Sequence, residues 1–462
     1  MRSIYFLALI ACATSILHAQ EHDFIEGPFA SPQELTETCL GCHEEVGDAV
    51  MATRHWNWLG KEFESGERGV IRLGKQNFIN NFCIGVTSNW PRCTSCHISY
   101  GWKDGSFDHS DPNNIDCLVC HDQTGTYKKT PTGAGMPAED VDLVTVAQSV
   151  GTPTRGNCGV CHFDGGGGSG VKHGDMDDSM YEPSAELDVH MGGLDFECTE
   201  CHTTEDHMIA GAGHGSMAED INHISCMDCH DDEVHEKSIL NNHISSVACE
   251  TCHVPAFARQ EATKTWWDWS AAGEDREAEK DKYGKETYSK KKGEFRWEKN
   301  VVPTYKWTRG KAEYYVQGDP VKAGAVVELN RIIGGIDDAE AKIAPFKVMR
   351  GKQPYDKEHG ILIVPHLFGK DGYWNTYDWD SASRIGMTAA GLDYSGSYGF
   401  IETEMSWPIN HMVAPAKQAL RCTSCHGKRG ERRLDWKALG YRKDPITRGT
   451  RFEQGLAKAP EE

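Results

Sequence analysis

The sequence is poor in apolar side chains, because only 39% of its 462 residues are hydrophobic. Beyond the N-terminus it lacks any run of about 20 apolar residues, so we expect no membrane span. Basic residues are outnumbered by acidic ones, 48 to 69, and the net charge of -21 argues against nucleic acid as a partner. Glycine and proline are too few for a disordered or low-complexity chain. Something other than aliphatic side chains must therefore fill the interior.

Cysteine and histidine are abundant instead. Sixteen of the 18 cysteines fall into eight Cys-x-x-Cys-His units, the attachment signal for c-type haem. Zinc sites, redox motifs and disulfide frameworks do not place a histidine after every second cysteine. The sequence therefore predicts eight covalently bound haem c groups. In chain order, units 1 to 8 are Cys39/Cys42/His43, Cys93/Cys96/His97, Cys117/Cys120/His121, Cys158/Cys161/His162, Cys198/Cys201/His202, Cys226/Cys229/His230, Cys249/Cys252/His253 and Cys422/Cys425/His426.

The N-terminus has the features of a secretory signal peptide. Met1-Arg2 precedes an apolar run, and Leu17-His18-Ala19 is a small-residue cleavage site. We expect residues 1–19 to be removed, with cleavage near Ala19, and the mature protein to be periplasmic. Haem attachment outside the cytoplasm fits this location.

The spacing of the units predicts the fold class. Seven units lie within residues 20–263, some only about 20 residues apart, which is too close for ordinary domains. We expect a heptahaem core, mainly α-helical with much irregular and little β structure. This is a multihaem cytochrome c fold in which packed haems form the core.

Residues 264–421 contain no attachment unit. We expect a charged loop over residues 274–299, a small hairpin over 301–321 from its alternating aromatic pattern, and a helix over 407–420 that delivers the eighth haem. Residues 422–462 then hold the eighth site and a basic tail, which we interpret as a surface arm.

Each motif histidine is expected to bind one iron, and a purely electron-transferring haem needs a second ligand. Twenty-two histidines, less the eight of the units and His18, leave 13, so counting alone cannot prove a vacant position. Seven are favoured because they lie close in sequence to a unit: His55, His190, His207, His214, His235, His243 and His411.

The segment after unit 4 is unusual. It reads Gly-Gly-Gly-Gly-Ser-Gly-Val-Lys-His-Gly-Asp from Gly165 to Asp175. Four glycines allow close approach of the backbone to a flat ring, and a deprotonated lysine amine can bind a metal. From spacing alone, a surface lysine on a flexible loop is the default interpretation of Lys172.

The eight units, the wide gap before the last, this glycine segment and the closing Leu434-Asp435-Trp436 run resemble octahaem tetrathionate reductase over essentially the whole mature chain. The resemblance implies that the second haem, on Cys93 and Cys96, is the active site. It implies that Lys172 binds this iron in place of His97, and that the other seven haems are bis-histidine.

Two further residues follow from the resemblance. The family has an acidic residue three positions before the lysine, where this chain has Ser169, and Asp164, Asp175 or Asp177 could substitute for it. The family also has a free cysteine near the active haem, which matches Cys83. Its thiol would meet the sulfur substrate, although a small buried apolar role is the plainer interpretation. Arg54, Arg92 and His109 are candidates for cations near the substrate because they lie close in sequence.

The expected activity is reduction of tetrathionate to thiosulfate, with electrons from a quinol-linked or small cytochrome donor. One alternative is a nitrite or hydroxylamine oxidoreductase that acts at the same haem, either reducing these compounds or oxidising hydroxylamine. A multihaem electron conduit without a catalytic iron is another, and full histidine coordination of all eight irons would support it.

Overall fold

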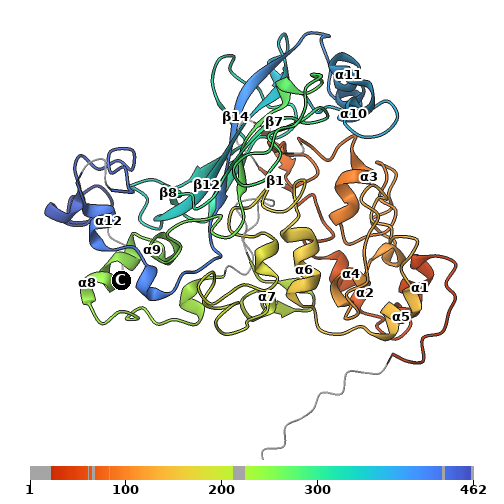
Figure 1. The fold of residues 1–462 in the computed structure, drawn as a ribbon, viewed down its shortest axis with the longest axis horizontal. Coiled ribbons are helices and arrows are strands. Elements are labelled where there is room, and N and C mark those ends of the chain that lie inside the picture. Colours follow the sequence, from red (N-terminus) through yellow and green to blue (C-terminus); the bar gives the residue numbers. More distant parts are fainter. Residues whose placement is uncertain are drawn as a thin grey trace, which may run out of the picture.

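The computed structural model describes residues 22–60, 62–64, 68–82, 84–211, 224–428 and 432–458. The predicted signal peptide, Cys83 and His214 lie outside these ranges. Figure 1 shows short helices and loops along one side of the molecule and a long, twisted sheet along the other. None of the helices within the described ranges is long and apolar enough to cross a bilayer.

The attachment units form short turns of helix. Two cysteines three residues apart lie on the same face of such a turn, so both sulfurs can reach one edge of a porphyrin. The helices are α1 (Pro32–Leu40), α2 (Val46–Met51), α3 (Trp90–Cys93), α4 (Leu118–His121), α5 (Leu143–Gln148), α6 (Arg155–His162), α7 (Cys198–Cys201), α8 (Ser238–Asn241), α9 (Cys249–His253), α10 (Tyr373–Thr376), α11 (Trp379–Ala389) and α12 (Cys422–His426). Unit 6 is a 3₁₀ turn, η5 (Cys226–Asp228).

The segment without attachment units forms most of a mixed sheet. The main path runs β10-β14-β12-β5-β7-β6, and β8 and β13 also pair with β12. The strands of this sheet are β5 (Thr263–Asp268), β6 (Tyr288–Ser289), β7 (Gly293–Glu298), β8 (Thr304–Thr308), β10 (Val327–Glu328), β12 (Lys342–Asp356), β13 (Ile361–Leu362) and β14 (Tyr398–Pro408). Three two-stranded ribbons complete the β structure: β1 (Glu62–Glu64) with β2 (Val70–Arg72), β3 (Thr204–Glu205) with β4 (Met208–Ile209), and β9 (Lys311–Tyr314) with β11 (Asn330–Ile333).

The structure of this region differs from several expectations. The expectation of little β structure is not confirmed, because a segment without haem has to build its own core and does so with an eight-stranded sheet. The predicted hairpin is absent: β8 pairs with β12, and β9 pairs with β11. The predicted helix over residues 407–420 is also absent, since β14 runs to Pro408 and only a short 3₁₀ turn, η8 (Ala416–Gln418), follows Pro415. The expected charged loop contains β6 and β7.

Aromatic side chains fill the core of the sheet region. The rings of Trp267 and Trp269 stack at 4.9 Å, and those of Tyr373 and Trp379 at 3.9 Å. Helix α11 is amphipathic and buries Trp379 and Met387 in the same cluster. The tryptophans thus supply the apolar area that the composition otherwise lacks.

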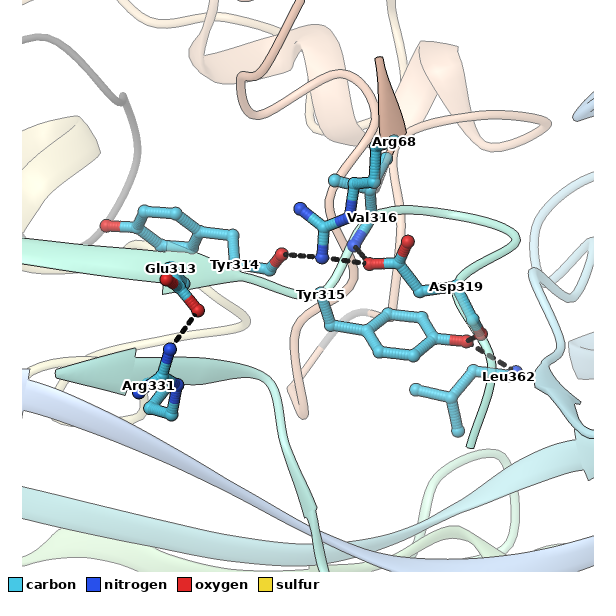
Figure 2. A network of polar contacts seen from close by, with 8 residues as sticks. All are labelled: Arg68, Glu313, Tyr314, Tyr315, Val316, Asp319, Arg331 and Leu362. Carbon is cyan, nitrogen blue, oxygen red and sulfur yellow. Dashed lines mark hydrogen bonds and ion pairs between the residues drawn. The ribbon is translucent and has the colours of Figure 1, made fainter. Parts of the chain in front are cut away.

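Figure 2 shows how the chain before unit 2 is tied to this region. The Arg68 guanidinium donates to the carbonyl of Tyr314 at 3.1 Å and to the carboxylate of Asp319 at 2.5 Å. The Tyr315 hydroxyl donates to the carbonyl of Asp319 and accepts from the backbone N–H of Leu362 at 2.9 Å. Arg68 thus joins the segment before unit 2 to β9 and the loop that follows it, and Tyr315 joins that loop to β13 of the sheet.

Candidate haem sites and active site

The attachment cysteines are not core residues of the polypeptide. None of the sixteen pairs in a disulfide, and each is either half-buried or exposed. A cysteine that only packs in a core is usually buried, and sequence reasoning gave no sign of this difference. The exposure has a physical reason, because a sulfur that bonds to a porphyrin edge must face the ring and not the interior of its own segment. The exposed members are Cys42, Cys96, Cys201, Cys226, Cys229 and Cys422.

Cys42 illustrates this placement in unit 1. It follows the end of α1, and its backbone N–H donates to the carbonyl of Cys39 at 3.1 Å, which closes the turn between the two cysteines. Cys39 is half-buried beside Cys117, whereas Cys42 is exposed. The unit thus has one sulfur directed toward a neighbouring unit and one at the surface of the chain. Cys42 stays the predicted second attachment residue of the first haem.

Seven of the eight motif histidines face a second histidine across a similar gap. Their ring centroids lie 6.0 to 6.4 Å apart. Each pair joins one motif histidine to one histidine from outside the units. The pairs are His43–His22, His121–His207, His162–His55, His202–His411, His230–His190, His253–His235 and His426–His243.

This spacing fits a metal held between two imidazoles. Two nitrogen–metal distances of about 2.0–2.1 Å, together with the radii of two rings, separate the centroids by roughly 6 Å. The Nδ1 atoms of several of these rings are already occupied. Nδ1 of His121 lies 2.9 Å from the carbonyl of Gly151, and Nδ1 of His202 lies 2.9 Å from the carbonyl of Ala210. Such contacts fix the tautomer and leave Nε2 for the iron.

Two of the facing pairs differ, because a carboxylate occupies Nδ1. Asp175 Oδ2 lies 3.1 Å from Nδ1 of His411, and Asp444 Oδ1 lies 2.6 Å from Nδ1 of His426. A carboxylate raises the basicity of the imidazole more than a neutral carbonyl does. Units 5 and 8 therefore have ligands with a distinct electrostatic environment.

The sulfurs of different units adjoin one another in a definite order. Contacts or electrostatic interactions between cysteines connect seven of the units in the order 1, 3, 4, 5, 6, 7 and 8. Unit 2 is outside this order and adjoins unit 4. The cysteines involved are Cys39 with Cys117, Cys120 with Cys158, Cys158 with Cys198, Cys201 with Cys229, Cys226 with Cys249, Cys252 with Cys422, and Cys96 with Cys161. In Figure 1 the series runs from α1 at the right to α12 at the left, with α3 nearer the sheet. Unit 2 is thus a branch on a continuous series.

Unit 2 has a different local structure. Its histidine turns away from the helical conformation, with φ -79° and ψ 147°. The His97 ring is fully buried, with Nε2 2.7 Å from the carbonyl of Trp56 and Nδ1 2.7 Å from the hydroxyl of Ser99. A carbonyl can only accept, so Nε2 carries the proton and has no lone pair for a metal. Burial lowers the pKa of His97 well below its usual value, so the ring is neutral.

The ring of His97 is also enclosed by aromatic side chains. The Trp58 and Trp102 rings lie edge-on to it at centroid distances of 4.9 and 4.7 Å, and the Trp56 ring lies at 5.4 Å. No second histidine ring faces His97 within the described ranges. The one unit whose histidine is held away from a metal is therefore the one that the resemblance singles out.

The Lys172 amine lies 4.8 Å from the ring centroid of Trp407. Burial, reinforced by the nearby Lys75 ammonium and partly opposed by Cys96, lowers the pKa of Lys172 to about 7. The amine is thus close enough to unit 2 to interact with Cys96, and it gives up its proton more readily than an exposed lysine. Closeness to the haem site and easy loss of the proton are what an amine needs in order to bind a metal.

The glycine run gives the Lys172 loop its shape. Gly166, Gly167 and Gly168 have φ values of +79°, +114° and +128°, which side chains rarely adopt. A Cβ on Gly166 would meet the Phe82 ring at 2.9 Å and Cβ of Lys172 at 3.1 Å. The run therefore packs against neighbouring side chains and turns the chain back toward unit 2.

The other predicted site residues have different surroundings. The Ser169 hydroxyl accepts from the backbone N–H of Asp178 at 3.1 Å, which stabilises the turn. The carboxylate of Asp175 is buried against His411 and also accepts from the backbone N–H of Asn410 at 2.8 Å. Asp175 therefore orients a histidine of the unit 5 pair. Cys83 is outside the described residues.

Sequence proximity missed the most suitable cation. Arg92 donates to the carbonyl of Pro131 at 2.9 Å, and the His109 ring packs edge-on against Trp102 at 4.8 Å. The Lys75 ammonium lies 3.7 Å from the Trp58 ring centroid and influences the pKa of both Lys172 and Cys96. No carboxylate among the described residues pairs with it. Its position between Gly74 and Gln76 gave no sequence signal.

These features define a multihaem c-type cytochrome. The family model described as "Cytochrome c bacterial" matches residues 264–429, and no curated protein matches the chain. A solved structure, octaheme cytochrome c from Shewanella oneidensis, is 49% identical with a TM-score of 0.88. The match covers 94% of this chain and 99% of that one. The chain belongs to the octahaem cytochromes c, and it carries eight covalently bound haem c groups. It is a redox protein.

Proposed function

We propose that the chain is an exported octahaem reductase that reduces tetrathionate at unit 2. The observation that carries this proposal is the difference between unit 2 and the other seven. Seven histidine pairs suit electron transfer, since a doubly ligated iron has no position for substrate. A neutral His97 bonded to Trp56 and Ser99, with the Lys172 amine nearby, supports a singly ligated haem with an open face.

The branching position of unit 2 supports the same assignment. Haem iron supplies one-electron exchange and an open coordination position. The series of seven units can deliver the two electrons in succession from an external quinol-linked or small cytochrome donor. A conduit without catalysis would not need a branch whose motif histidine is enclosed by tryptophan rings. We take residues 1–19 as the export signal to the periplasm.

The reaction requires positive charge at the site. Tetrathionate takes up two electrons, its central sulfur–sulfur bond breaks, and two thiosulfate anions form, so its negative charge doubles. Fixed cations stabilise such developing charge best in a partly buried site. We propose that the Lys75 ammonium contacts the substrate anion while the Lys172 amine holds the iron. Cys83 remains the candidate thiol for contact with sulfur.

The test uses the dye-reduced holoprotein and follows its reoxidation. We expect fast reoxidation by tetrathionate, with competition from nitrite and hydroxylamine if all three use one open face. Lys172→Met should slow all three and leave absorbance from the other seven haems unchanged. Uniformly slow oxidation that is insensitive to Lys172→Met would support the electron conduit instead.

A further inference from the structure

The sheet reaches the Lys172 loop through one cross-strand pair. Lys347 of β12 lies directly opposite Trp407 of β14, so the two side chains project from the same face. The Trp407 ring lies under the Lys172 amine, with 4.8 Å between amine and ring centroid. Lys347 reaches the backbone of the same residue. One pair on the sheet thus contacts Lys172 at both its backbone and its amine.

Each N–H group of the Lys347 ammonium has a hydrogen-bond acceptor. Its side chain is completely buried. Nζ donates to the carbonyl of Val171 at 2.8 Å, to the carbonyl of Lys172 at 3.0 Å and to the hydroxyl of Thr263 at 2.6 Å. Thr263 can accept there because its own proton goes to the carbonyl of Gly170 at 2.7 Å or of His173 at 3.1 Å. Three acceptors match the three N–H groups of an ammonium.

The same strand also holds the segment that precedes unit 2. Gln353 has the same parity as Lys347 in β12, so both side chains are on one face. Its amide donates to the carbonyl of Asn80 at 2.8 Å, and the carbonyl of Met349 accepts from the Asn81 amide at 2.7 Å. Strand β12 therefore contacts both the loop with Lys172 and the segment that precedes unit 2.

We infer that Lys347 is a positioning residue for Lys172 and that the haem-free sheet serves as the alignment platform of the active site. Lys347 binds the carbonyls of Val171 and Lys172 and so fixes the backbone position of Lys172. The Trp407 ring fixes the position of the Lys172 amine. This inference rests on the proposed function, because it assumes that Lys172 binds the iron of unit 2.

The experiment compares Lys347→Met with Lys306→Met in the holoprotein. Lys306 is the matched control, because it is a half-buried lysine of the same sheet that donates to the Ser406 hydroxyl at 2.9 Å. The readout is the amine-to-iron signature of one haem, measured by magnetic circular dichroism and electron paramagnetic resonance. We expect Lys347→Met to lose or split this signature and to slow turnover about a hundredfold, as misplacement by about 1 Å does. Lys306→Met should leave the signature unchanged.

A second variant keeps the test decisive if Lys347→Met does not accumulate. Lys347→Gln keeps a polar side chain, but its shorter stem and two N–H donors cannot serve the carbonyls of Val171 and Lys172 and the hydroxyl of Thr263 together. A shifted amine signature in Lys347→Gln supports the inference. An unchanged signature in folded Lys347→Gln or Lys347→Met overturns it. Absence of the amine signature from the wild-type protein would instead refute the proposed function, so the two failures are distinguishable.

Discussion

Asp444→Asn should raise the reduction potential of the haem at unit 8. Asp444 Oδ1 lies 2.6 Å from Nδ1 of His426, with the two side chains only 18% and 12% exposed. A carboxylate favours the more positive, oxidised iron through the imidazole, so its neutralisation favours reduction. The asparagine retains the shape, and its oxygen can still accept from the backbone N–H of Ile446, now 3.1 Å away.

The magnitude follows from the hydrogen bond that changes. Bonds to charged groups contribute about 1.5–3 kcal/mol and neutral ones about 0.5–1.5 kcal/mol, a difference of about 1 kcal/mol. Because 1.4 kcal/mol corresponds to about 59 mV for one electron, the potential should rise by up to roughly 40 mV.

The assay is a spectroelectrochemical titration of variant and wild type, in which the difference should integrate to one haem of eight. Asp435→Asn is the matched control, since Asp435 caps an exposed turn of the same tail at the backbone N–H of Lys437 and contacts no histidine among the described residues. A downward shift, or equal curves for Asp444→Asn and wild type, would refute the reasoning.

Three further predictions concern separate parts of the molecule. Lys75→Met should lower kcat/KM for tetrathionate about tenfold, with kcat falling as well as KM rising, because it removes a charged contact that strengthens as negative charge develops. An unchanged kcat/KM would exclude Lys75 from the substrate site. His22→Ala should leave the iron at His43 with one protein ligand and add one high-spin haem signal. His359→Ala, which removes an exposed ring, is the control and should add no such signal. Equal spectra of the two variants would contradict the pairing of His22 with His43. Trp379→Ala should lower the free energy of unfolding by about 3–5 kcal/mol in denaturant titrations, and a loss below about 1 kcal/mol would contradict the aromatic core.

Local sequence patterns predicted the cofactor content because haem attachment is encoded within five residues. The expectation of eight haem c groups is confirmed by the relationship to the octahaem cytochrome. Proximity to a unit also selected six of the histidines that face a motif ring, namely His55, His190, His207, His235, His243 and His411. The seventh favoured histidine, His214, lies outside the described residues. His22, which was not favoured, faces His43.

Proximity could not predict which histidines face each other. His55 follows unit 1 in sequence but faces His162 of unit 4, and His411 precedes unit 8 but faces His202 of unit 5. Such pairs depend on tertiary packing between distant segments. The surroundings of His97 are likewise tertiary, because its two partners come from residues 41 positions before and two after it.

The sheet was the largest omission. Its long strand β12 pairs with β5, which is about 80 residues earlier, and with β14, about 50 residues later. Alternation suggested β structure only over residues 301–321, and the partner strands were not recognisable there. Lys347 was invisible for the same reason, because its role depends on contacts with Val171 and Lys172, 176 and 175 positions away.

The most direct test of the central claim is a ligand count on the oxidised protein by near-infrared magnetic circular dichroism, with Lys172→Met measured beside it. We predict seven bis-histidine haems and one haem with an amine ligand, and we predict that Lys172→Met removes only the amine signal. Eight bis-histidine haems in the wild type, or an amine signal that persists in Lys172→Met, would contradict the account.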